Sequence, residues 1–523
     1  MALSTAFRFV LLLIIGLAFA GCATLPENVE RPVSTAYADT EDTSIGRRVK
    51  EVGRERGGMS GYHLLADGLD AFVVRLVLAD RAERSIDAQY YLLHTDVVGS
   101  LFIDRLYSAA ERGVRVRLLV DDIDLGGRDF GAAALDAHPN MEVRFFNPFS
   151  RKVGRTIQYI TGFGKQTRRA HNKSFTVDNQ ATILGGRNIG DAYFEADTEF
   201  SFVDLDVLVF GPIAGEVSAS FDQYWNSELS YPVSTLVDKI PTPQEAAQKK
   251  AEFDAFVAQQ QGSKYIDYLR QSDLAEDLRN GRVEYELADG VVVADDPEKL
   301  NTSASETTYR LSDKLEPYLK NVKNELIIFS PYFVPGKSGL AFFKELRDKG
   351  VQVKILTNSL ASTDVGIVHA GYARYRNNLL RMGVNLYELD QNLDRETGTS
   401  AKKDKTVGGS KASLHAKCFI LDRKTVFVGS LNLDARSVIQ NTEIGVVFEA
   451  EPIARYLAED FDRQIDKAAF RLELVEGADG VGRLRWHGYS NGKPITFNHD
   501  PYTGFWERFG VGFMGMLPIE SQI

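Results

Sequence analysis

Cysteine is scarce in this chain of 523 residues, which contains only Cys22 and Cys418. Two thiols cannot build a disulfide framework, and they cannot supply a metal site made of several cysteines. Cys418 lies in an apolar stretch next to Lys417 and Phe419. We expect it to be a small buried residue.

The N-terminus lacks an apolar run long enough to cross a bilayer comfortably. Its run from Phe9 to Ala20 has twelve residues and is followed by Gly21 and Cys22. This length suits the apolar region of a signal peptide, and Cys22 after Ala-Gly resembles the lipidation site of bacterial lipoproteins. We therefore expect residues 1–22 to be a lipoprotein signal peptide, with a lipid attached to Cys22. An uncleaved membrane-associated helix is the alternative.

A lipid at Cys22 would anchor the protein in the bacterial cell envelope, on the periplasmic side of the inner or the outer membrane. Both alternatives keep a membrane surface close to the protein. Residues 23–45 show no hydrophobic periodicity, and they predict a tether.

Positive charge is scarcer than negative charge, because the chain has 61 Lys and Arg but 72 Asp and Glu, which gives a net charge of −11. Proteins that bind nucleic acid usually carry a basic surface, so this balance argues against a nucleic-acid partner. The length suits two to four domains, and 44% hydrophobic residues are ordinary for a globular protein.

One pattern occurs twice, in residues 169–188 (RAHNKSFTVDNQATILGGRN) and 413–432 (SLHAKCFILDRKTVFVGSLN). Each copy has His-x-Lys, an Asp five positions after the Lys, and later a small residue and an Asn. One and the same offset separates all corresponding residues, which are His171 and His415, Lys173 and Lys417, Asp178 and Asp422, Gly186 and Ser430, Asn188 and Asn432.

This spacing has a simple meaning if the motif begins a β-strand. Side chains two positions apart point to the same face of a strand, so the His and the Lys of each copy would lie together. A second strand, over Ala181–Leu184 or Thr425–Val428, would return a small residue and an Asn to the same end. Two copies brought together would hold a tetrahedral anion between two imidazoles and two lysines, which describes a phosphate site.

A carboxylate follows each copy at the start of another apolar stretch. Asp204 follows the first copy, and Glu443 follows the second at a similar spacing from its histidine. A carboxylate that accepts from the Nδ1–H of an imidazole fixes its tautomer and raises the basicity of Nε2. We expect Asp204 and Glu443 to orient the two imidazoles, either within one unit or across the seam between the units, and we regard Asp206 as the weaker rival to Asp204.

The regions before the motifs also repeat. Residues 85–93 and 114–122 predict strands around a helix at 100–112, and 325–333, 342–350 and 351–359 repeat this strand, helix and strand. Alternating strands and helices indicate a largely parallel sheet with both faces covered. The spacing from Gly113 to Gly350 nearly equals that between the two motifs, which indicates a duplicated α/β unit.

These observations give the following domain organisation. After the signal peptide and the tether come a first unit at 46–235, a helical connector at 236–300 and a second unit at 301–475. Residues 476–523 form a C-terminal segment rich in glycine and aromatic residues. Core packing is slightly favoured for its aromatic side chains, and a lipid interface is the alternative.

Two further stretches carry weaker signals. Residues 151–169 interleave basic and aromatic residues close to the first motif, and they predict either a solvated loop or contact with lipid headgroups. The other stretch contains His369, Tyr372 and Arg376. We expect these residues either to lie near the site or to make ordinary packing contacts.

The doubled pattern resembles the defining motif of the phospholipase D superfamily. The resemblance covers about Asp70 to Phe470, and it implies two pseudo-two-fold-related α/β/α sandwich units, a pseudo-dimer within one chain, with the active site at their interface. It also implies that the His, Lys and Asp of each motif belong to the catalytic set, within which Asp178 and Asp422 look structural, placed to hold the turn after the strand. His171 would act as nucleophile and His415 as general acid and base, although local sequence does not order the two.

Four further stretches are IDAQYY (86–91), NPFS (147–150), GGRNIGDAYF (185–194) and the ending LPIESQ (517–522). With these stretches the chain resembles, within the superfamily, the C-type bacterial cardiolipin synthases. That resemblance implies transfer of a phosphatidyl group, from phosphatidylethanolamine or phosphatidylglycerol, to a hydroxyl of phosphatidylglycerol through a phosphohistidine. Asn188, Ser430 and Asn432 would support the transferred phosphate, and we expect no cofactor and no metal. A phospholipase D that releases phosphatidic acid is the main alternative. A nuclease of the superfamily and a non-catalytic lipid-binding lipoprotein are further ones.

Overall fold

The computed structural model describes residues 25–55, 57–161, 166–197, 199–303, 305–392, 411–477, 482–490 and 492–516. The predicted signal peptide and Cys22 lie outside these residues.

The first unit is built on a sheet of nine strands in the order β10-β1-β8-β6-β5-β2-β3-β4-β9. In chain order the strands are β1 (Ser60–Leu65), β2 (Ser85–Tyr90), β3 (Arg115–Asp121), β4 (Met141–Phe146), β5 (Ser174–Val177), β6 (Ala181–Gly185), β8 (Asp206–Phe210), β9 (Ser230–Pro232) and β10 (Glu286–Ala288). β2, β3 and β4 are parallel, and their neighbours are antiparallel.

The second unit is built on a sheet of ten strands in the order β11-β18-β17-β16-β12-β13-β14-β19-β20-β21. In chain order they are β11 (Gly290–Ala294), β12 (Glu325–Phe329), β13 (Gln352–Asn358), β14 (Asn385–Leu389), β16 (Cys418–Leu421), β17 (Thr425–Gly429), β18 (Ile444–Phe448), β19 (Ala469–Glu476), β20 (Gly482–Ser490) and β21 (Lys493–Phe497). From β11 to β19 this order repeats that of β1 to β9, strand for strand. The duplication predicted from sequence is therefore confirmed by the topology.

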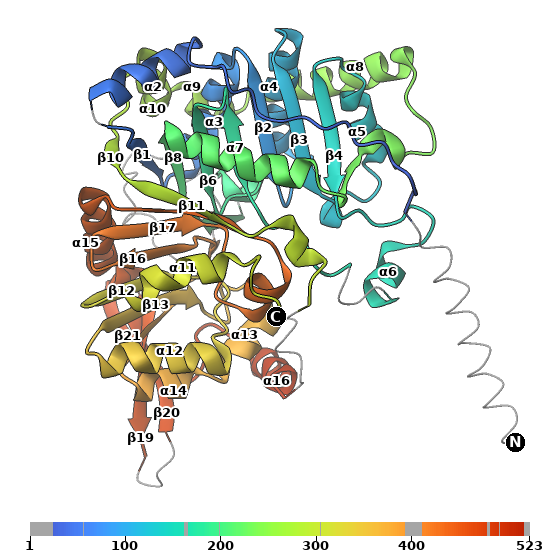
Figure 1. Ribbon diagram of the computed structural model, residues 1–523. Helices are drawn as coiled ribbons and strands as arrows, with labels where there is room; N and C mark the ends of the chain where they lie inside the picture. Colours follow the sequence, from blue (N-terminus) through green and yellow to red (C-terminus); the bar gives the residue numbers. More distant parts are fainter. Residues whose placement is uncertain are drawn as a thin grey trace, which may run out of the picture.

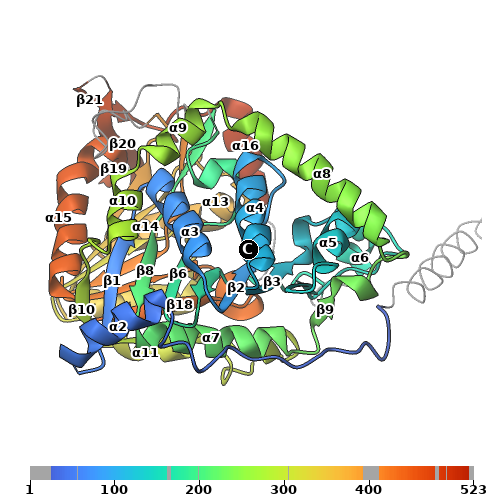
Figure 2. The ribbon, with the colours of Figure 1, turned by 90° about the horizontal axis from the view of Figure 1, so that it is seen from above.

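Helices cover both faces of each sheet, and Figures 1 and 2 show the two units stacked one on the other. The helices are α2 (Ser44–Glu55), α3 (Gly68–Arg81), α4 (Val97–Glu111), α5 (Asp129–Asp136), α6 (Arg155–Thr161), α7 (Pro212–Trp225), α8 (Pro243–Gln260), α9 (Lys264–Arg270), α10 (Asp273–Asn280), α11 (Leu311–Lys320), α12 (Gly336–Asp348), α13 (Gly366–Ala373), α14 (Arg376–Arg381), α15 (Glu451–Ala468) and α16 (Phe505–Met514).

Local sequence explains where the equivalent helices begin and end. The side chain of Asp96 accepts from the backbone N–H of Gly99 and caps the start of α4. Gly113 and Gly350 follow α4 and α12 with φ of 93° and 86°, a conformation that favours glycine. After Gly113 the chain enters the mostly buried strand β3, and after Gly350 it enters the mostly buried strand β13.

The two units share an apolar core at their interface. Val207 and Val209 of β8 pack in one buried cluster with Val426 and Val428 of β17 and with residues of β18. The ring of Tyr62 in β1 stacks on that of Phe448 in β18, with centroids 4.2 Å apart. This core fixes how the two motif-bearing strand pairs face each other.

The predicted tether is wrong for the part of it that the structure describes. Arg31 donates to the carbonyl of Ser230 at 2.9 Å, and buried Arg117 and Arg144 donate to the carbonyls of Ser34 and Pro32. These contacts hold the segment along the first unit. Burying an arginine without such acceptors would be costly.

The connector at 236–300 contains the predicted helices α8, α9 and α10, which pack against the first unit. It also adds β10 to the first sheet and β11 to the second. The second unit therefore begins before residue 301. The C-terminal segment likewise adds β20 and β21 to the second sheet, beyond the predicted limit at 475.

Candidate active site

The two motifs lie where the two units meet. His171 and Lys173 stand just before β5, and His415 and Lys417 stand just before β16. All four side chains are buried. Each imidazole lies within electrostatic reach of the lysine of the other unit, because each lysine lowers the pKa of the opposite histidine. The structure thus brings together groups that the sequence places in two distant motifs.

Each imidazole is oriented by a carboxylate of the other unit. Nδ1 of His171 lies 2.8 Å from Oε2 of Glu443, and Nδ1 of His415 lies 2.6 Å from Oδ2 of Asp204. Asp204 and Glu443 are therefore placed as the sequence predicts, and the pairing is crossed. Because Nδ1 is engaged in both rings, Nε2 is the free nitrogen of each histidine.

The crossing follows from the main chain. The N–H of His171 donates to the carbonyl of Thr442, directly before Glu443. In the same way the N–H of His415 donates to the carbonyl of Val203, directly before Asp204. β15 (Lys411–Leu414) extends this second contact by pairing in parallel with β7 (Phe200–Val203) of the other unit.

A second pair of equivalent residues holds the chain before each histidine. Asp121 at the end of β3 accepts from the N–H of Ala170 at 2.9 Å. Asn358 at the end of β13 accepts from the N–H of Leu414 at 2.8 Å. The offset between Asp121 and Asn358 in the sequence equals that between the two glycines that precede β3 and β13. Sequence reasoning missed this pair, although the offset could have identified it.

The lysines sit in a setting that weakens their charge. Burial lowers the pKa of Lys173 to about 7 and that of Lys417 to about 8, although nearby carboxylates oppose the shift. Each Nζ donates to the carbonyl of the preceding histidine, at 2.6 Å for Lys173 and 2.5 Å for Lys417. Two desolvated ammonium groups beside two imidazoles form a receptor for an anion.

The two carboxylates differ in charge. Burial opposes the ionisation of Asp204, but His415 and Lys417 hold its pKa at about 2. Burial raises the pKa of Glu443 to about 7, despite Lys173 and Ser430. The pKa of His171 lies well below its ordinary value because of burial and the lysines. Burial also lowers the pKa of His415, but its partner Asp204 opposes that change.

The small residue of each motif also differs between the halves, although the hydrogen bond from Ser430 lowers the pKa of Glu443 and so does not cause its rise. Ser430 Oγ donates to Oε2 of Glu443 at 2.5 Å. At Gly186 a side chain would lie within 2.1 Å of Oδ1 of Asp204, so only glycine fits there. The first half uses a backbone donor in place of the hydroxyl, because the N–H of Leu205 donates to Oδ1 of Asp204 at 2.8 Å.

The two asparagines also differ. Asn188 accepts from the N–H of Leu92 and donates to the hydroxyl of Tyr193 at 2.9 Å. Tyr193 in turn packs edge-on against the ring of His415, with centroids 5.2 Å apart. Asn188 therefore acts on the site through Tyr193. Oδ1 of Asn432 has no hydrogen-bond partner in the described part of the chain.

Aromatic rings surround both histidines. Tyr91 packs edge-on against His171 at 4.9 Å and lies 5.3 Å from Nζ of Lys173. Phe202 packs against His415 at 4.9 Å. No separate signal in the sequence pointed to these rings.

Comparison with known proteins identifies the family of this arrangement. A family model described as "Cardiolipin synthase, PLD-like domain" matches residues 76–225 and 315–465. The chain is 41% identical over 464 residues to cardiolipin synthase C of Escherichia coli (strain K12), covering 88% of this chain and 96% of the relative. The chain belongs to the cardiolipin synthase family of phospholipase D-like proteins.

More distant relatives agree. A cardiolipin synthase of Clostridium perfringens (strain SM101 / Type A) is 23% identical over 80% of this chain and 74% of its own length. Among solved structures, phosphatidylserine synthase of Haemophilus influenzae Rd KW20 aligns with a TM-score of 0.51 at 14% identity, over 81% of this chain and 92% of its own. That structure supports the fold alone. Together the sequence relatives establish an enzyme of the phospholipase D-type phosphatidyltransferase class.

In this phospholipase D-like site the motif aspartates lie away from the histidines. Asp178 and Asp422 stand directly after β5 and β16, five residues and about 16 Å of strand from the lysines. Asp178 accepts from the backbone N–H groups of residues 83–85, and Asp422 accepts from those of residues 323–325. The motif groups both aspartates with the catalytic residues, whereas their contacts give them a structural part.

The connector contributes one residue that sequence reasoning missed. The carboxylate of Asp295 accepts from the backbone N–H of Glu443 at 2.7 Å and from Nζ of Lys299 at 2.9 Å. Its backbone N–H donates to the carbonyl of Glu443 at 2.9 Å. Asp295 thus positions the carboxylate that orients His171. The rival carboxylate Asp206 instead pairs with buried Arg75 at 2.7 Å.

The basic stretch before the first motif is mostly engaged inside the protein. Arg151 and Arg155 pair with Asp122, and Arg169 pairs with Asp121. Arg168 donates to backbone carbonyls of residues 300 and 302. The alternative that these four arginines bind lipid headgroups is therefore wrong. Phe163 and Lys165 of this stretch lie outside the described residues.

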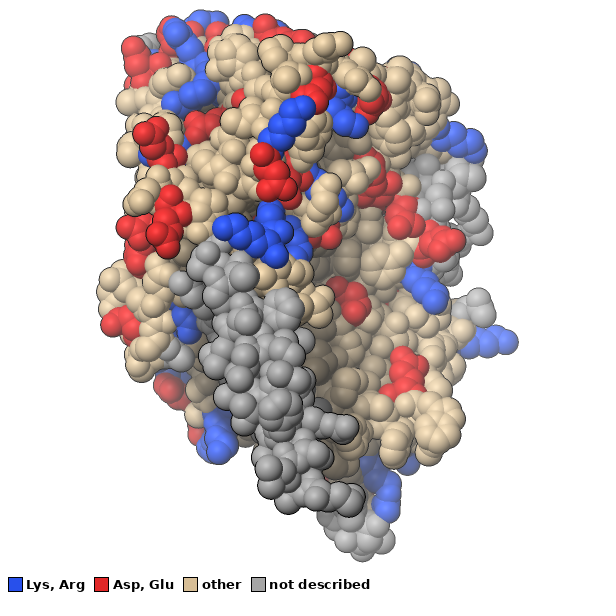
Figure 3. Space-filling view, turned by 90° about the vertical axis from the view of Figure 1, so that its right-hand side faces the viewer, with Lys and Arg blue, Asp and Glu red and all other residues tan. Residues whose placement is uncertain are grey.

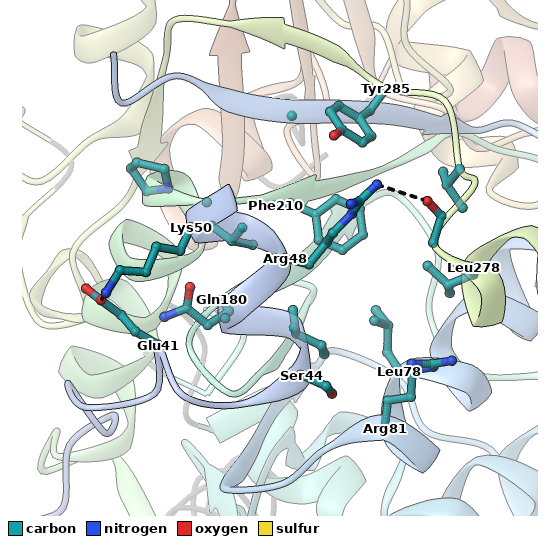
Figure 4. Close-up of a pocket in the computed structure, with 18 of the residues that line it drawn as sticks. Glu41, Ser44, Arg48, Lys50, Leu78, Arg81, Gln180, Phe210, Leu278 and Tyr285 are labelled. Carbon is teal, nitrogen blue, oxygen red and sulfur yellow. Dashed lines mark hydrogen bonds and ion pairs between the residues drawn. The ribbon is translucent and has the colours of Figure 1, made fainter. Parts of the chain in front are cut away.

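A cavity of about 780 Å³ lies elsewhere, at the opposite end of the first sheet. Figure 4 shows its lining, which includes Arg48, Leu78, Phe210, Leu278 and Tyr285. None of the predicted site residues lines it. In the described part of the chain, no helix has both the length and the apolar character needed to cross a bilayer.

Proposed function

We propose that the protein is a cardiolipin synthase, which transfers a phosphatidyl group to a hydroxyl of phosphatidylglycerol. The observation that carries the proposal is the crossed pairing of His171 with Glu443 and of His415 with Asp204, beside two buried lysines. The names of the relatives support the choice of lipids.

In the first step, Nε2 of His171 attacks the phosphorus of the donor phospholipid, and the P–O bond to the leaving alcohol breaks. His415 gives its proton to the leaving oxygen, so that ethanolamine or glycerol departs. The electrostatics support this order of roles. The pKa of His171 lies well below its ordinary value because of burial and the lysines, so its ring is neutral and has a free lone pair, whereas Asp204 opposes the lowering of the His415 pKa.

In the second step, His415 takes the proton from a hydroxyl of phosphatidylglycerol. The alkoxide attacks the phosphohistidine, and the N–P bond breaks to regenerate neutral His171. Lys173 and Lys417 stabilise the negative charge on the phosphoryl oxygens in both steps. Ser430 acts through Glu443, and Asn188 acts through Tyr193.

The aromatic surroundings favour transfer over hydrolysis. Tyr91, Tyr193 and Phe202 pack directly on the two imidazoles. Such walls limit the approach of water to the phosphohistidine, and a lipid hydroxyl that binds in the site then reacts first.

A lipid anchor at Cys22 would place the enzyme beside its substrates, with phosphatidylglycerol and phosphatidylethanolamine as the lipids offered to the site. Cell fractionation with labelled fatty acid, comparing wild type with Cys22→Ala, tests this part. Label in the wild type alone supports the anchor, and label in neither form contradicts it.

The decisive experiment is lipid analysis after expression in bacteria that lack cardiolipin, with His171→Ala and His415→Ala as matched variants. We expect cardiolipin from the wild type alone, with activity in either variant lower by at least about 10³-fold. Phosphatidic acid in place of cardiolipin would show that the enzyme is a phospholipase D. Cardiolipin from either variant would overturn the mechanism.

A further inference from the structure

The second unit exposes an aromatic face on its last described helix, α16. Phe505, Trp506 and Phe509 have exposed fractions of 64%, 77% and 59%, and Phe513 and Met516 continue the same face. The sequence slightly favoured core packing for this segment, and that expectation is wrong for these side chains. A contiguous exposed apolar face usually marks a binding surface.

The rings of this face already contact one another. The centroid of Trp506 lies 5.3 Å from that of Phe505 and 6.0 Å from that of Phe509. Phe505 and Phe509 are stacked at 6.3 Å. Since the cluster is assembled before anything binds, little side-chain entropy is lost on contact.

Contacts with α13 and contacts just before the helix hold α16 on the second unit, although none of its own residues is buried. A side chain at Gly515 would lie 3.6 Å from the carbonyl of Ala370, so the end of the helix packs closely on α13. Just before α16, Asp500 pairs with Arg376 at 2.9 Å, and Arg376 donates to Nε2 of His369 at 2.9 Å. His369 and Arg376 therefore hold Asp500 in the segment that leads into α16, which gives both residues a packing role.

Helix α13, on which α16 packs, is also linked to residues near the candidate site. Asp364 lies two residues before α13 and accepts from the hydroxyl of Tyr332 at 2.7 Å. Its charge acts on Lys417 and on Tyr193. α13 thus connects the aromatic face to residues within electrostatic reach of the motif lysine.

We propose that the face of α16 formed by Phe505, Trp506, Phe509, Phe513 and Met516 enters the interface of a phospholipid bilayer and docks the active site on its substrates. The proposal rests on the proposed function only in taking membrane lipids as substrates. A net charge of −11 gives no general attraction to anionic lipid, so apolar contact must supply the binding. Tryptophan and phenylalanine suit the headgroup level of a bilayer.

Uncharged residues also border a hollow on the side of the molecule that carries α6, which Figure 3 views. A second copy of the chain is the competing occupant.

The fluorescence of Trp506 can serve as the probe in a test of this proposal. It has three tryptophans, of which Trp225 and Trp486 are buried and Trp506 is exposed. The full chain is mixed with vesicles of phosphatidylethanolamine and phosphatidylglycerol that carry bromine on their acyl chains, and fluorescence quenching is measured. An N-terminal anchor would hold the protein at the vesicle without bringing the indole of Trp506 into the acyl region.

We expect quenching in the wild type, its loss in Trp506→Phe, and weakening by at least about tenfold in vesicle titrations of Phe505→Ser/Phe509→Ser. The matched control is Tyr456→Ser/Tyr489→Ser, which removes two exposed rings from other elements and should leave quenching unchanged. Unquenched Trp506 in the wild type overturns the proposal. So does Trp506 shielding without lipid that rises with protein concentration, because it identifies a second copy as the occupant.

Activity separates this proposal from the proposed function. Phe505→Ser/Phe509→Ser should lower synthesis from vesicles about tenfold and leave the rate on monomeric short-chain phosphatidylglycerol unchanged. Equal rates on vesicles overturn the docking surface while the synthase stands. A wild type that is quenched but makes no cardiolipin from either substrate retains the surface and overturns the function.

Discussion

The two halves of the active site share one backbone plan and differ in their electrostatics. In both halves a histidine N–H binds the residue before the partner carboxylate. Yet Asp204, beside Gly186, has a pKa of about 2, whereas Glu443, beside Ser430, has a pKa of about 7. Duplication thus supplied the geometry, and burial and neighbouring charges set the two carboxylates apart.

The difference has a direct chemical use. A site with two identical dyads would have two equally basic imidazoles, and nothing would choose the nucleophile. In the proposed mechanism Asp204 helps His415 to keep a proton, because it opposes the lowering of that ring's pKa, whereas the His171 ring beside Glu443 stays neutral. General acid catalysis and nucleophilic attack need these opposite states at the same pH.

The strongest test of this asymmetry compares Asp204→Asn with Glu443→Gln at pH 6. Asp204→Asn removes an ionised partner and should lower kcat by about 10²- to 10⁴-fold. Glu443→Gln replaces a group that is mostly neutral at pH 6, because its pKa is about 7, and should cost only about tenfold. Steady-state synthesis measures both, and equal losses would contradict the division of roles.

A second test exchanges the small residues. Gly186→Ser places a side chain within 2.1 Å of the Asp204 carboxylate and should lower kcat by about 10²-fold through misplacement of His415. Ser430→Gly removes one hydrogen bond to Glu443 and should cost about three- to tenfold. Thermal unfolding of both variants separates misplacement from loss of fold. An active Gly186→Ser enzyme would show that the Asp204 carboxylate can move freely.

The lysines predict a decline in kcat/KM as the pH rises. The pKa of Lys173 is about 7 and that of Lys417 about 8, so both are charged below pH 7 and both become neutral above pH 8. Each lost charge should weaken phosphate binding, with about a tenfold fall per pH unit for each proton. Lys173→Arg should leave a fall centred near 8, and Lys417→Arg one near 7. A flat profile from pH 6 to 9 would contradict the lowered values.

The motif aspartates make equivalent contacts in the two halves, so we expect their substitution to have equal effects. Asp178→Asn and Asp422→Asn remove a charged acceptor of three backbone N–H groups, and both tolerate the local φ of 52°. Each should lower the free energy of unfolding by about 1–3 kcal/mol with kcat changed less than about twofold. Denaturant unfolding measures the loss, with Asp254→Asn on exposed α8 as the control. A large fall in kcat without loss of stability would restore these residues to the catalytic set.

Much of the fold could be predicted because its signals are local. Alternating strands and helices, the matching offsets between the two copies and the β-forming runs around each motif all lie in the order of residues. The same order places each His and Lys on one face at the start of a strand. Periodicity therefore sufficed for the topology and for the two halves of the catalytic set.

Other features depend on contacts that local sequence does not encode. The sequence offered Asp204 and Glu443, but only the folded interface pairs each of them with the histidine of the other unit. Asp295 looked like part of a featureless connector, and the aromatic helix α16 looked like core. Their roles come from what packs beside them.

The sequence by itself determined which groups meet at the active site, because the duplicated motif carries its residues on a repeated fold. The tertiary structure alone decided which carboxylate serves which histidine and which of them is charged. The physical reason is that a pKa depends on burial and on the distance to neighbouring charges. Those quantities arise only when distant segments are packed together.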